Sequence, residues 1–139
     1  TKSRIKWYND SVSSSPTRTI AGLNAFALRN LILIAGGYDK NLDYEPLAKP
    51  IVDNCKTLIL LGQTADKIEK AVKKELKNSN KNVEIYRCNS LRETVELANH
   101  LAVKGDIVLF SPASASFDMF KNFAERGVIF KDFVKEIVK

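Results

Sequence analysis

The sequence predicts an α/β fold: a Rossmann-like open, mostly parallel sheet of about six strands with helices on both faces. Four short apolar runs begin at residues 31, 57, 83 and 107, so each starts 24 to 26 residues after the one before. Helical patterns fill the intervals, and this recurrence is typical of parallel strands joined by right-handed crossovers. The runs at 31–35 and 57–61 are continuously apolar, as strands buried on both faces are.

The composition is that of an ordinary globular chain with one core. The 139 residues are 45% hydrophobic and 27% charged, which suits a single domain. No apolar run approaches the roughly 20 residues of a membrane-spanning helix, so we expect no membrane partner. The N-terminus has no initiator methionine and no leader pattern, and we expect the chain to be a piece of a longer protein.

The net charge of +6 raises the question of an anionic partner. The densest basic stretch, 67–81, contains glutamates and no interleaved aromatic residue. We therefore interpret it as the solvated face of a helix and expect no nucleic-acid partner.

Cysteine and histidine usage gives little support for a metal or redox site. Cys55 and Cys88 form no Cys-x-x-Cys pair, and we expect both to be reduced residues at strand ends. The single histidine, His100, falls late in a predicted helix, where we expect a surface position.

The first predicted unit is a strand, a polar loop and a helix. Residues 5–8 alternate weakly and predict a strand that is antiparallel or at an edge. Pro16 suits the first position of a helix, with Ser15 as N-cap. The loop between them places hydroxyls and free N–H groups at a helix start. Asp10 in this loop also suits a simple turn residue.

The second unit places a lysine at the ligand-binding edge of the sheet. The strand at 31–35 is followed by Gly36 and Gly37, which allow a tight turn or a close backbone approach. Lys40 then stands just beyond the carboxyl end of a central strand, where ligands of open α/β sheets bind. The alternative is an exposed loop lysine.

The middle of the chain continues the alternation of strands and helices. We expect helices over 43–52 and 64–76, a strand nearer an edge at 83–86, and a strand at 107–110. Ser90 and Glu93 form a capping box that opens a further helix.

The stretch 111–127, SPASASFDMFKNFAERG, joins the last strand to the last helix. Small residues or proline fill 111–116, and we expect the helix to begin near 117 or 118, with Gly127 as a potential break. Its core stripe is predicted to include Phe120, Phe123, Phe130, Val134 and Ile137. Uncapped N–H groups beside serine hydroxyls form a site for a carboxylate or phosphate. The plainer alternative is that Ser116 is the helix N-cap.

The stretch 111–127 resembles the signature of the D-glutamate-adding Mur ligases, Ser-Pro-Ala-x-Ala-Ser-(Phe/Leu)-Asp-x-Phe-Lys-Asn-Phe-x-x-Arg-Gly. It departs at Ser114, where cysteine is usual, and at Ala124, where an acidic residue is usual. Residues 8–19, YNDSVSSSPTRT, are similar to the family's Asn-Asp-Ser-Lys-Ala-Thr segment. There Val12 stands where many members carry a lysine, so that lysine's contact with the nucleotide cannot be made.

The resemblance implies roles for individual residues. Lys40 matches the lysine of the family's Gly-Gly-x-x-Lys. The resemblance implies no catalytic residue and no metal ligand within this domain. It implies nucleotide binding by Asp10 and Ser11, and D-glutamate binding by Ser14, Lys40, Ser116 and the backbone N–H groups of Phe117 and Phe123.

The resemblance also implies an activity for the complete enzyme. Residues 1–139 resemble the C-terminal domain of a three-domain ligase, without its N-terminal and central domains. Such an enzyme adds D-glutamate to UDP-MurNAc-L-alanine in cytoplasmic peptidoglycan precursor synthesis, through an acyl phosphate. ATP and Mg²⁺ are the implied cofactors, with magnesium held mainly by the absent central domain. We expect a monomer, and an isolated domain that folds without ligase activity.

Two other interpretations stay open. The chain is similar in layout to other Mur-type or folylpolyglutamate-synthase-like ligase domains. Those commonly carry an Asp-Tyr-Ala-His motif where residues 9–11 stand, and that motif is absent here. The chain could also be a free-standing α/β small-molecule binding module. An upstream reading frame with a phosphate-binding loop would argue against that interpretation.

Overall fold

A computed structural model of the chain describes residues 4–26, 30–116 and 120–138. Strands and helices alternate along it, as the sequence predicts. In chain order the elements are β1 (Lys6–Asn9), α1 (Pro16–Asn24), β2 (Leu31–Ala35), α2 (Glu45–Asn54), β3 (Cys55–Leu60), α3 (Ala65–Lys77), β4 (Glu84–Arg87), α4 (Leu91–Leu101), β5 (Ile107–Phe110) and α5 (Phe123–Ile137).

The strands form one parallel sheet in the order β1-β5-β2-β3-β4. The predicted fold class is confirmed. The described residues contain five strands rather than about six, because each of the runs named above forms one strand and no further run is extended. β1 lies at an edge and pairs parallel with β5, with Lys6 opposite Ile107, so an antiparallel first strand is wrong.

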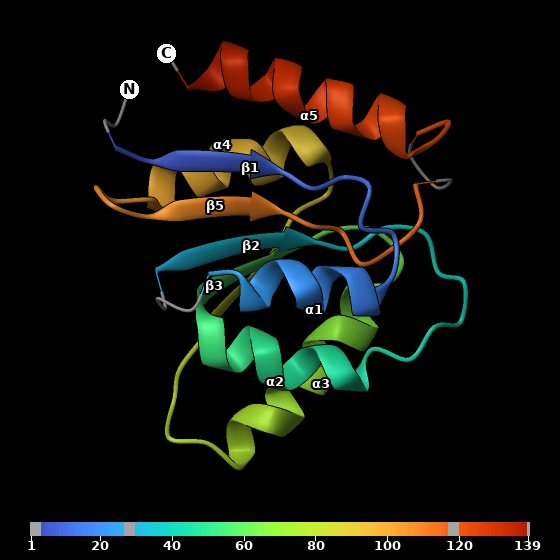
Figure 1. The fold of residues 1–139 in the computed structure, drawn as a ribbon, viewed down its shortest axis with the longest axis vertical. Helices are drawn as coiled ribbons and strands as arrows, with labels where there is room; N and C mark the ends of the chain where they lie inside the picture. Colours follow the sequence, from blue (N-terminus) through green and yellow to red (C-terminus); the bar gives the residue numbers. More distant parts are fainter. Residues whose placement is uncertain (1–3, 27–29, 117–119, 139) are drawn as a thin grey trace.

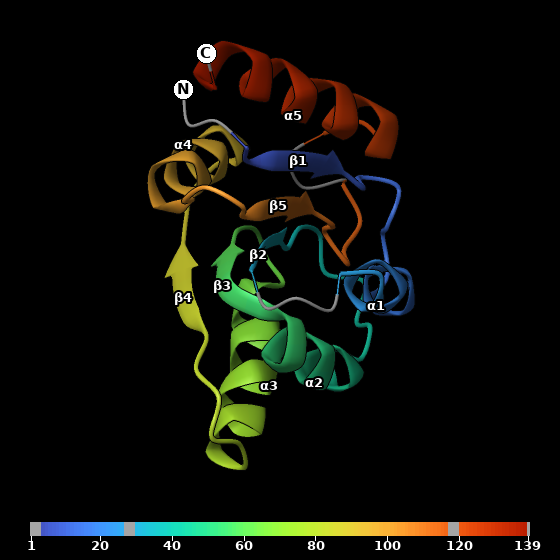
Figure 2. The ribbon, with the colours of Figure 1, turned by 60° about the vertical axis from the view of Figure 1, so that its left-hand side comes forward.

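The helices cover both faces of the sheet. α1, α2 and α3 lie on one face, and α4 and α5 lie on the other (Figure 1). The turned view separates the same two groups (Figure 2). None of the helices within the described residues is long and apolar enough to cross a membrane.

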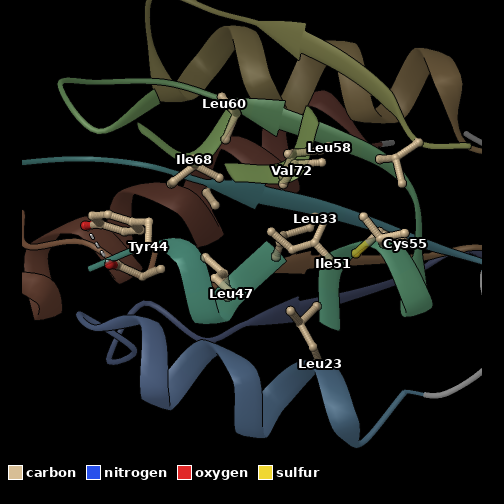
Figure 3. Close-up of a cluster of buried hydrophobic side chains, with 14 of the residues drawn as sticks. Leu23, Leu33, Tyr44, Leu47, Ile51, Cys55, Leu58, Leu60, Ile68 and Val72 are labelled. Atoms are coloured by element: carbon tan, nitrogen blue, oxygen red, sulfur yellow. Dashed lines mark hydrogen bonds between the residues drawn. The ribbon is translucent and has the colours of Figure 1, made fainter. Parts of the chain in front are cut away.

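Two hydrophobic clusters hold these layers together. Leu31 and Leu33 of β2 point into the cluster under α1, α2 and α3, while Ile32 and Ile34 point into the cluster under α4 and α5. All four side chains are fully buried, which explains the continuous apolar run. Figure 3 shows the first cluster, where side chains of α1, α2 and α3 meet those of β2 and β3. Burial of each such side chain contributes about 1.5–3 kcal/mol before entropy costs.

The cysteines and the histidine lie where the sequence predicts. Cys55 is buried at the start of β3, and Cys88 is half-buried just after β4; the two are not joined in a disulfide. His100 is exposed near the end of α4.

The helix starts agree with the sequence only in part. At α4 half of the predicted capping box is present: the backbone N–H of Glu93 donates to Ser90 Oγ at 3.2 Å. Glu93 Oε1 accepts at 2.7 Å from the N–H of Asn89, one residue before the N-cap. At α1, Ser15 occupies the N-cap position but its side chain makes no capping hydrogen bond. Pro16 stands at the start of that helix, as predicted.

The predicted start of the last helix is wrong. α5 begins at Phe123, and its N-cap is Asn122, whose Oδ1 accepts from the N–H of Glu125 at 2.8 Å. The alternative with Ser116 as N-cap is wrong for the same reason. Since Phe123 is the first helical residue, its side chain is 48% exposed and does not join the core stripe. Phe130 lies in that stripe fully buried, stacked on Phe110 with 4.5 Å between ring centroids.

Gly127 lies inside α5 and does not interrupt it. A Cβ on Gly127 would lie 3.2 Å from Ser11 Cβ and 3.4 Å from Asn9 Nδ2. The side chain of Asn9 donates to the carbonyl of Gly127 at 2.8 Å. The missing side chain therefore lets α5 approach the loop after β1.

The order of the strands defines where a ligand can enter. β1 and β2 are followed by helices on one face, whereas β5, which lies between them, is followed by α5 on the other face. The chain therefore leaves neighbouring strands toward opposite faces of the sheet, and open α/β sheets bind ligands at such points beyond the carboxyl ends of the strands. The polar loops singled out in the sequence are those that follow β1, β2 and β5.

Candidate functional site

The loop 111–116 connects the three segments that the sequence predicts to converge. The backbone N–H of Ala113 donates to the carbonyl of Ser13 at 2.9 Å, and the N–H of Tyr38 donates to the carbonyl of Ala115 at 2.8 Å. All six residues of the loop are buried. The loops after β1, β2 and β5 therefore form one hydrogen-bonded unit.

The glycine pair before Lys40 permits this contact. Gly37 has a φ of 159°, and a Cβ there would lie 2.5 Å from the carbonyl oxygen of Ala115. Any other residue would push the two loops apart. Lys40 follows three residues later, and its side chain is exposed.

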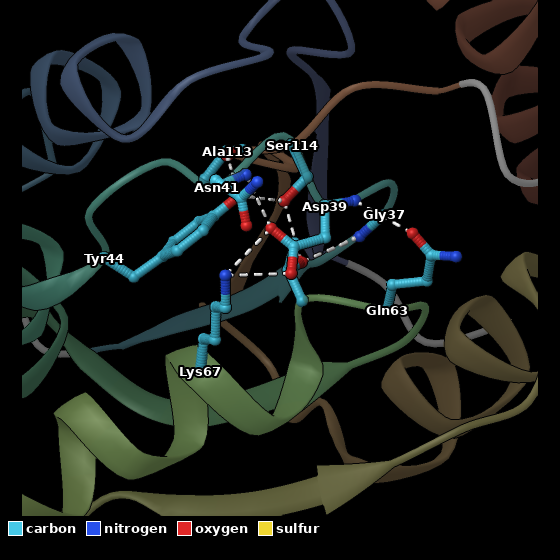
Figure 4. A network of polar contacts seen from close by, with 9 residues as sticks. Gly37, Asp39, Asn41, Tyr44, Gln63, Lys67, Ala113 and Ser114 are labelled. Atoms are coloured by element: carbon cyan, nitrogen blue, oxygen red, sulfur yellow. Dashed lines mark hydrogen bonds and ion pairs between the residues drawn. The ribbon is translucent and has the colours of Figure 1, made fainter.

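A chain of hydrogen-bonded, buried hydroxyl groups links the loops after β2 and β5; Figure 4 labels two of its members, Tyr44 and Ser114. Tyr44 Oη donates to the carbonyl of Ala113 at 3.0 Å and lies 2.9 Å from Ser114 Oγ. Ser114 Oγ lies 2.8 Å from Thr64 Oγ1, which accepts from the N–H of Gly37 at 3.1 Å. Tyr44 Oη donates its only proton to the carbonyl of Ala113, so it must accept from Ser114 Oγ. Ser114 Oγ in turn accepts from Thr64 Oγ1, which accepts from the N–H of Gly37. Burial raises the pKa of Tyr44, which keeps the phenol protonated as a donor.

The backbone on either side of Lys40 is held by Asp39. Its carboxylate pairs with Lys67 at 2.9 Å and accepts from the N–H of Asn41 at 2.8 Å (Figure 4). The hydrogen bond from Lys67 lowers the pKa of Asp39, with a further contribution from the N–H of Asn41. The N–H of Asp39 donates to Gln63 Oε1 at 3.0 Å. Lys40 is therefore presented from a fixed turn.

Arg126 is a structural member of the site that sequence reasoning missed. Its side chain is almost fully buried and lies over the ring of Phe110. Nε donates to Ser11 Oγ at 3.0 Å, and Nη2 donates to the Ser11 carbonyl at 2.7 Å and to Ser14 Oγ at 3.3 Å. Nη1 donates to the carbonyl of Ser114 at 2.8 Å. The only signal in the sequence is the Arg-Gly pair that ends 111–127, and because arginines are rarely buried, that pair does not predict a buried side chain.

Asp10 is fixed by two hydroxyl groups. Its Oδ2 accepts from Ser13 Oγ at 2.6 Å and from Ser111 Oγ at 2.8 Å. The N–H of Asp10 donates to the carbonyl of Phe110 at 2.7 Å, which continues the pairing of β1 with β5. The carboxylate is therefore positioned by both loops at the carboxyl ends of these strands.

Two neighbouring hollows open beside these loops. The Asp10 hollow, of about 580 Å³, lies between β1 and α1 and is lined by Asp10 together with Val12 and Arg18. The Ser14 hollow, of about 430 Å³, is lined by Ser14 and Phe123, and again by Val12 and Arg18. One of the two residues predicted to bind nucleotide, Asp10, and two of those predicted to bind D-glutamate, Ser14 and Phe123, thus line adjoining hollows.

The other predicted site residues lie in different settings. Ser11 is buried, and its hydroxyl proton is donated to the carbonyl of Phe123 at 2.7 Å. Ser116 is 4% exposed at the end of the loop 111–116, and Lys40 is exposed in the loop after β2. Phe117 lies outside the described residues. The contacts of all these residues with ligands stay predictions.

No three His, Cys, Asp or Glu side chains gather closely enough to hold a metal ion in residues 4–26, 30–116 and 120–138.

The fold and the three converging loops define an open parallel α/β domain with a ligand crevice at its strand ends. The sequence profile described as "Mur ligase, glutamate ligase domain" matches residues 1–114. The chain belongs to this family of Mur ligase domains.

Three curated relatives of the chain share one name. The chain is 55% identical over 135 residues to the UDP-N-acetylmuramoylalanine–D-glutamate ligase of Acetivibrio thermocellus, and 50% identical over 133 residues to the ligases of that name from Clostridium tetani and Clostridium botulinum (strain 657). Each alignment covers 96% of this chain and 29% of the relative. The chain thus spans less than a third of the length of these relatives.

Proposed function

We propose that this chain is the D-glutamate-binding domain of an ATP-dependent ligase that joins D-glutamate to UDP-MurNAc-L-alanine in the cytoplasm. The observation that carries the proposal is the 55% identity to a ligase of that name across 96% of the chain. The convergence of the loops after β1, β2 and β5 supports it, because the residues with matching chemistry all lie on these loops or at the start of α5.

The proposed reaction has two steps, a phosphoryl transfer and an amide formation. The carboxylate of UDP-MurNAc-L-alanine takes the terminal phosphoryl group of ATP, which gives an acyl phosphate and ADP. The amine of D-glutamate then attacks the acyl carbon, the C–O bond to phosphate breaks, and phosphate leaves as the amine loses a proton. ATP supplies the leaving group; the magnesium that accompanies it in the proposal would be held outside the residues described here.

The role of this chain is to bind and orient the amino acid. D-glutamate carries two carboxylates, which need a cation and hydrogen-bond donors. Lys40 supplies the cation, and the hydroxyls of Ser14 and Ser116 supply donors. Phe123 is the first residue of α5, so its N–H has no acceptor within the helix and can donate to a ligand. Holding the amine in line with the acyl phosphate lowers the entropic part of the barrier.

The nucleotide contact of the proposal rests on Asp10. Its carboxylate is fixed by Ser13 and Ser111 and lines the Asp10 hollow. A fixed carboxylate is a suitable acceptor for the paired hydroxyls of a ribose. Ser11, predicted beside it, holds the loop through Phe123 and Arg126.

The test is a product assay with the complete ligase chain. Incubation with ATP, UDP-MurNAc-L-alanine and D-glutamate is expected to give ADP and one new amide in equal amounts, and L-glutamate is expected to give little product. Preference for another amino acid would reject the D-glutamate assignment. ATP hydrolysis without an amide product would reject the ligase assignment.

A further inference from the structure

The Asp10 hollow and the Ser14 hollow share one cationic side chain, Arg18 of α1. Among the described residues that line either hollow, Arg18 is the only lysine or arginine. It lies on the first turn of α1, a turn with no acidic residue, and its side chain is exposed. Arg18 takes part in no ion pair within residues 4–26, 30–116 and 120–138. Its guanidinium is thus available to a ligand that enters the hollows.

We propose that Arg18 binds the phosphate groups of the nucleotide. This proposal rests on the proposed function, in which Asp10 binds the ribose. Nucleotide phosphates carry several negative charges, and they would lie near the Asp10 carboxylate if the ribose did. The negative charges of the phosphates and of the Asp10 carboxylate would repel each other, and a cation close to both reduces this repulsion. Arg18 is the cation that the walls of these hollows provide.

Val12 shares both hollows with Arg18 but carries no charge. Its side chain is 45% exposed, but it cannot neutralise an anion. The loop after β1 therefore brings no cation of its own to the hollows, and α1 supplies it. A guanidinium suits phosphate because its planar N–H groups donate two parallel hydrogen bonds.

The experiment measures nucleotide binding to the complete ligase chain by calorimetric titration. ADP and adenosine are the probes, because they differ only in the phosphates. Arg18→Ala is expected to raise the Kd of ADP at least tenfold, the effect of losing about one charge-assisted hydrogen bond. It should change the Kd of adenosine less than twofold. Lys70→Ala, which removes an equal charge from an exposed position on α3, serves as the matched control and should change neither constant.

A second variant separates a ligand contact from a structural effect. Val12→Lys in the Arg18→Ala background returns a cation to both hollows, and we expect it to bring the Kd of ADP back to within about threefold of the original chain. Loss of stability at position 18 would not be repaired by a lysine at position 12. Failure of this rescue would overturn the proposal.

The remaining outcomes distinguish failure of the phosphate-binding role of Arg18 from failure of the proposed ligase function. If Arg18→Ala raises the Kd of adenosine as much as that of ADP, or changes neither Kd, Arg18 does not bind phosphate. If it raises only the KM of D-glutamate, the guanidinium serves the amino-acid carboxylate and the proposal is wrong. If the unaltered chain neither binds ADP nor forms product, the proposed function itself fails.

Discussion

Arg126 should be among the residues whose replacement costs this fold most. Its guanidinium donates to two backbone carbonyls, those of Ser11 and Ser114, and to the hydroxyls of Ser11 and Ser14. Arg126→Ala leaves the two carbonyls without this donor in a buried setting, at about 1–3 kcal/mol each. We therefore expect the free energy of unfolding to fall by about 3–5 kcal/mol, out of a total of about 5–15 kcal/mol for a domain.

Thermal and urea unfolding of this chain measure the effect. For a domain of this size the expected loss corresponds to a melting temperature lower by about 10–20 °C. Arg126→Lys should give an intermediate value, because one ammonium group cannot reach all four acceptors at once. Arg92→Ala is the matched control: Arg92 also lies over a phenylalanine ring, but its ion pairs with Glu96 and Glu136 are at the surface.

Surface ion pairs contribute about 0.2–1 kcal/mol, so Arg92→Ala should lower the stability only slightly. If the free energies of unfolding of Arg126→Ala and Arg92→Ala lie within 1 kcal/mol of each other, the buried guanidinium does not hold the loops after β1 and β5 together. A large loss for both would contradict the distinction between buried and exposed arginines.

Lys40→Ala in the complete ligase should raise the KM for D-glutamate about tenfold or more, with the melting temperature unchanged because the side chain is exposed; an unchanged KM in steady-state kinetics would contradict the assigned role. Tyr44→Phe and Ser114→Ala should each lower the unfolding free energy by about 1–2 kcal/mol in urea titrations, because each breaks the buried hydroxyl chain; equal stability would show that the chain is dispensable. The pKa of Asp53 is lowered, first by the hydrogen bond from Lys81, so its contribution to stability is present above pH 3.8 and is lost as the pH falls below that value. Asp53→Asn should therefore flatten the acid limb of a stability-against-pH curve, and an unaltered limb would argue against this pair.

The strands and their order along the chain could be predicted because burial on both faces leaves a direct mark in the sequence. The runs 31–35 and 57–61 are apolar at every position or nearly so, and β2 and β3 cover almost the same residues. The sheet order could not be read in the same way. The insertion of β5 between β1 and β2 depends on contacts between segments more than 70 residues apart.

The start of the last helix was mispredicted for a local reason. Ser116 and Asn122 are both good N-cap residues, and the sequence alone does not rank them. The structure has Asn122 as the cap, since its side chain and extended backbone satisfy the N–H of Glu125. The shift moves Phe123 from an interior position to the first exposed position of α5, where it lines the Ser14 hollow.

The residues that hold the site were the hardest to predict. Lys40 and Asp10 can be recognised in the sequence because each closely follows a predicted strand, and position after a strand is a local property. Arg126 and Tyr44 contact loops that are distant in sequence; Arg126 and Ser11, for example, are 115 positions apart. In the sequence both residues fall inside predicted helices, which give no sign of those partners. Such contacts appear only when the sheet has brought the loops together.

Ser11 tests whether these two groups of residues can be told apart. The resemblance assigns it to the nucleotide, yet its hydroxyl donates to the carbonyl of Phe123 and accepts from Arg126 Nε. Ser11→Ala should therefore lower the unfolding free energy by about 1–3 kcal/mol, because it leaves a carbonyl and an N–H without a partner. The Kd of ADP and the KM of D-glutamate should then rise by similar small factors, since both hollows adjoin the same loop. A selective rise in the Kd of ADP at unchanged melting temperature would instead show that the hydroxyl leaves its internal partners to bind nucleotide, and would refute the structural role.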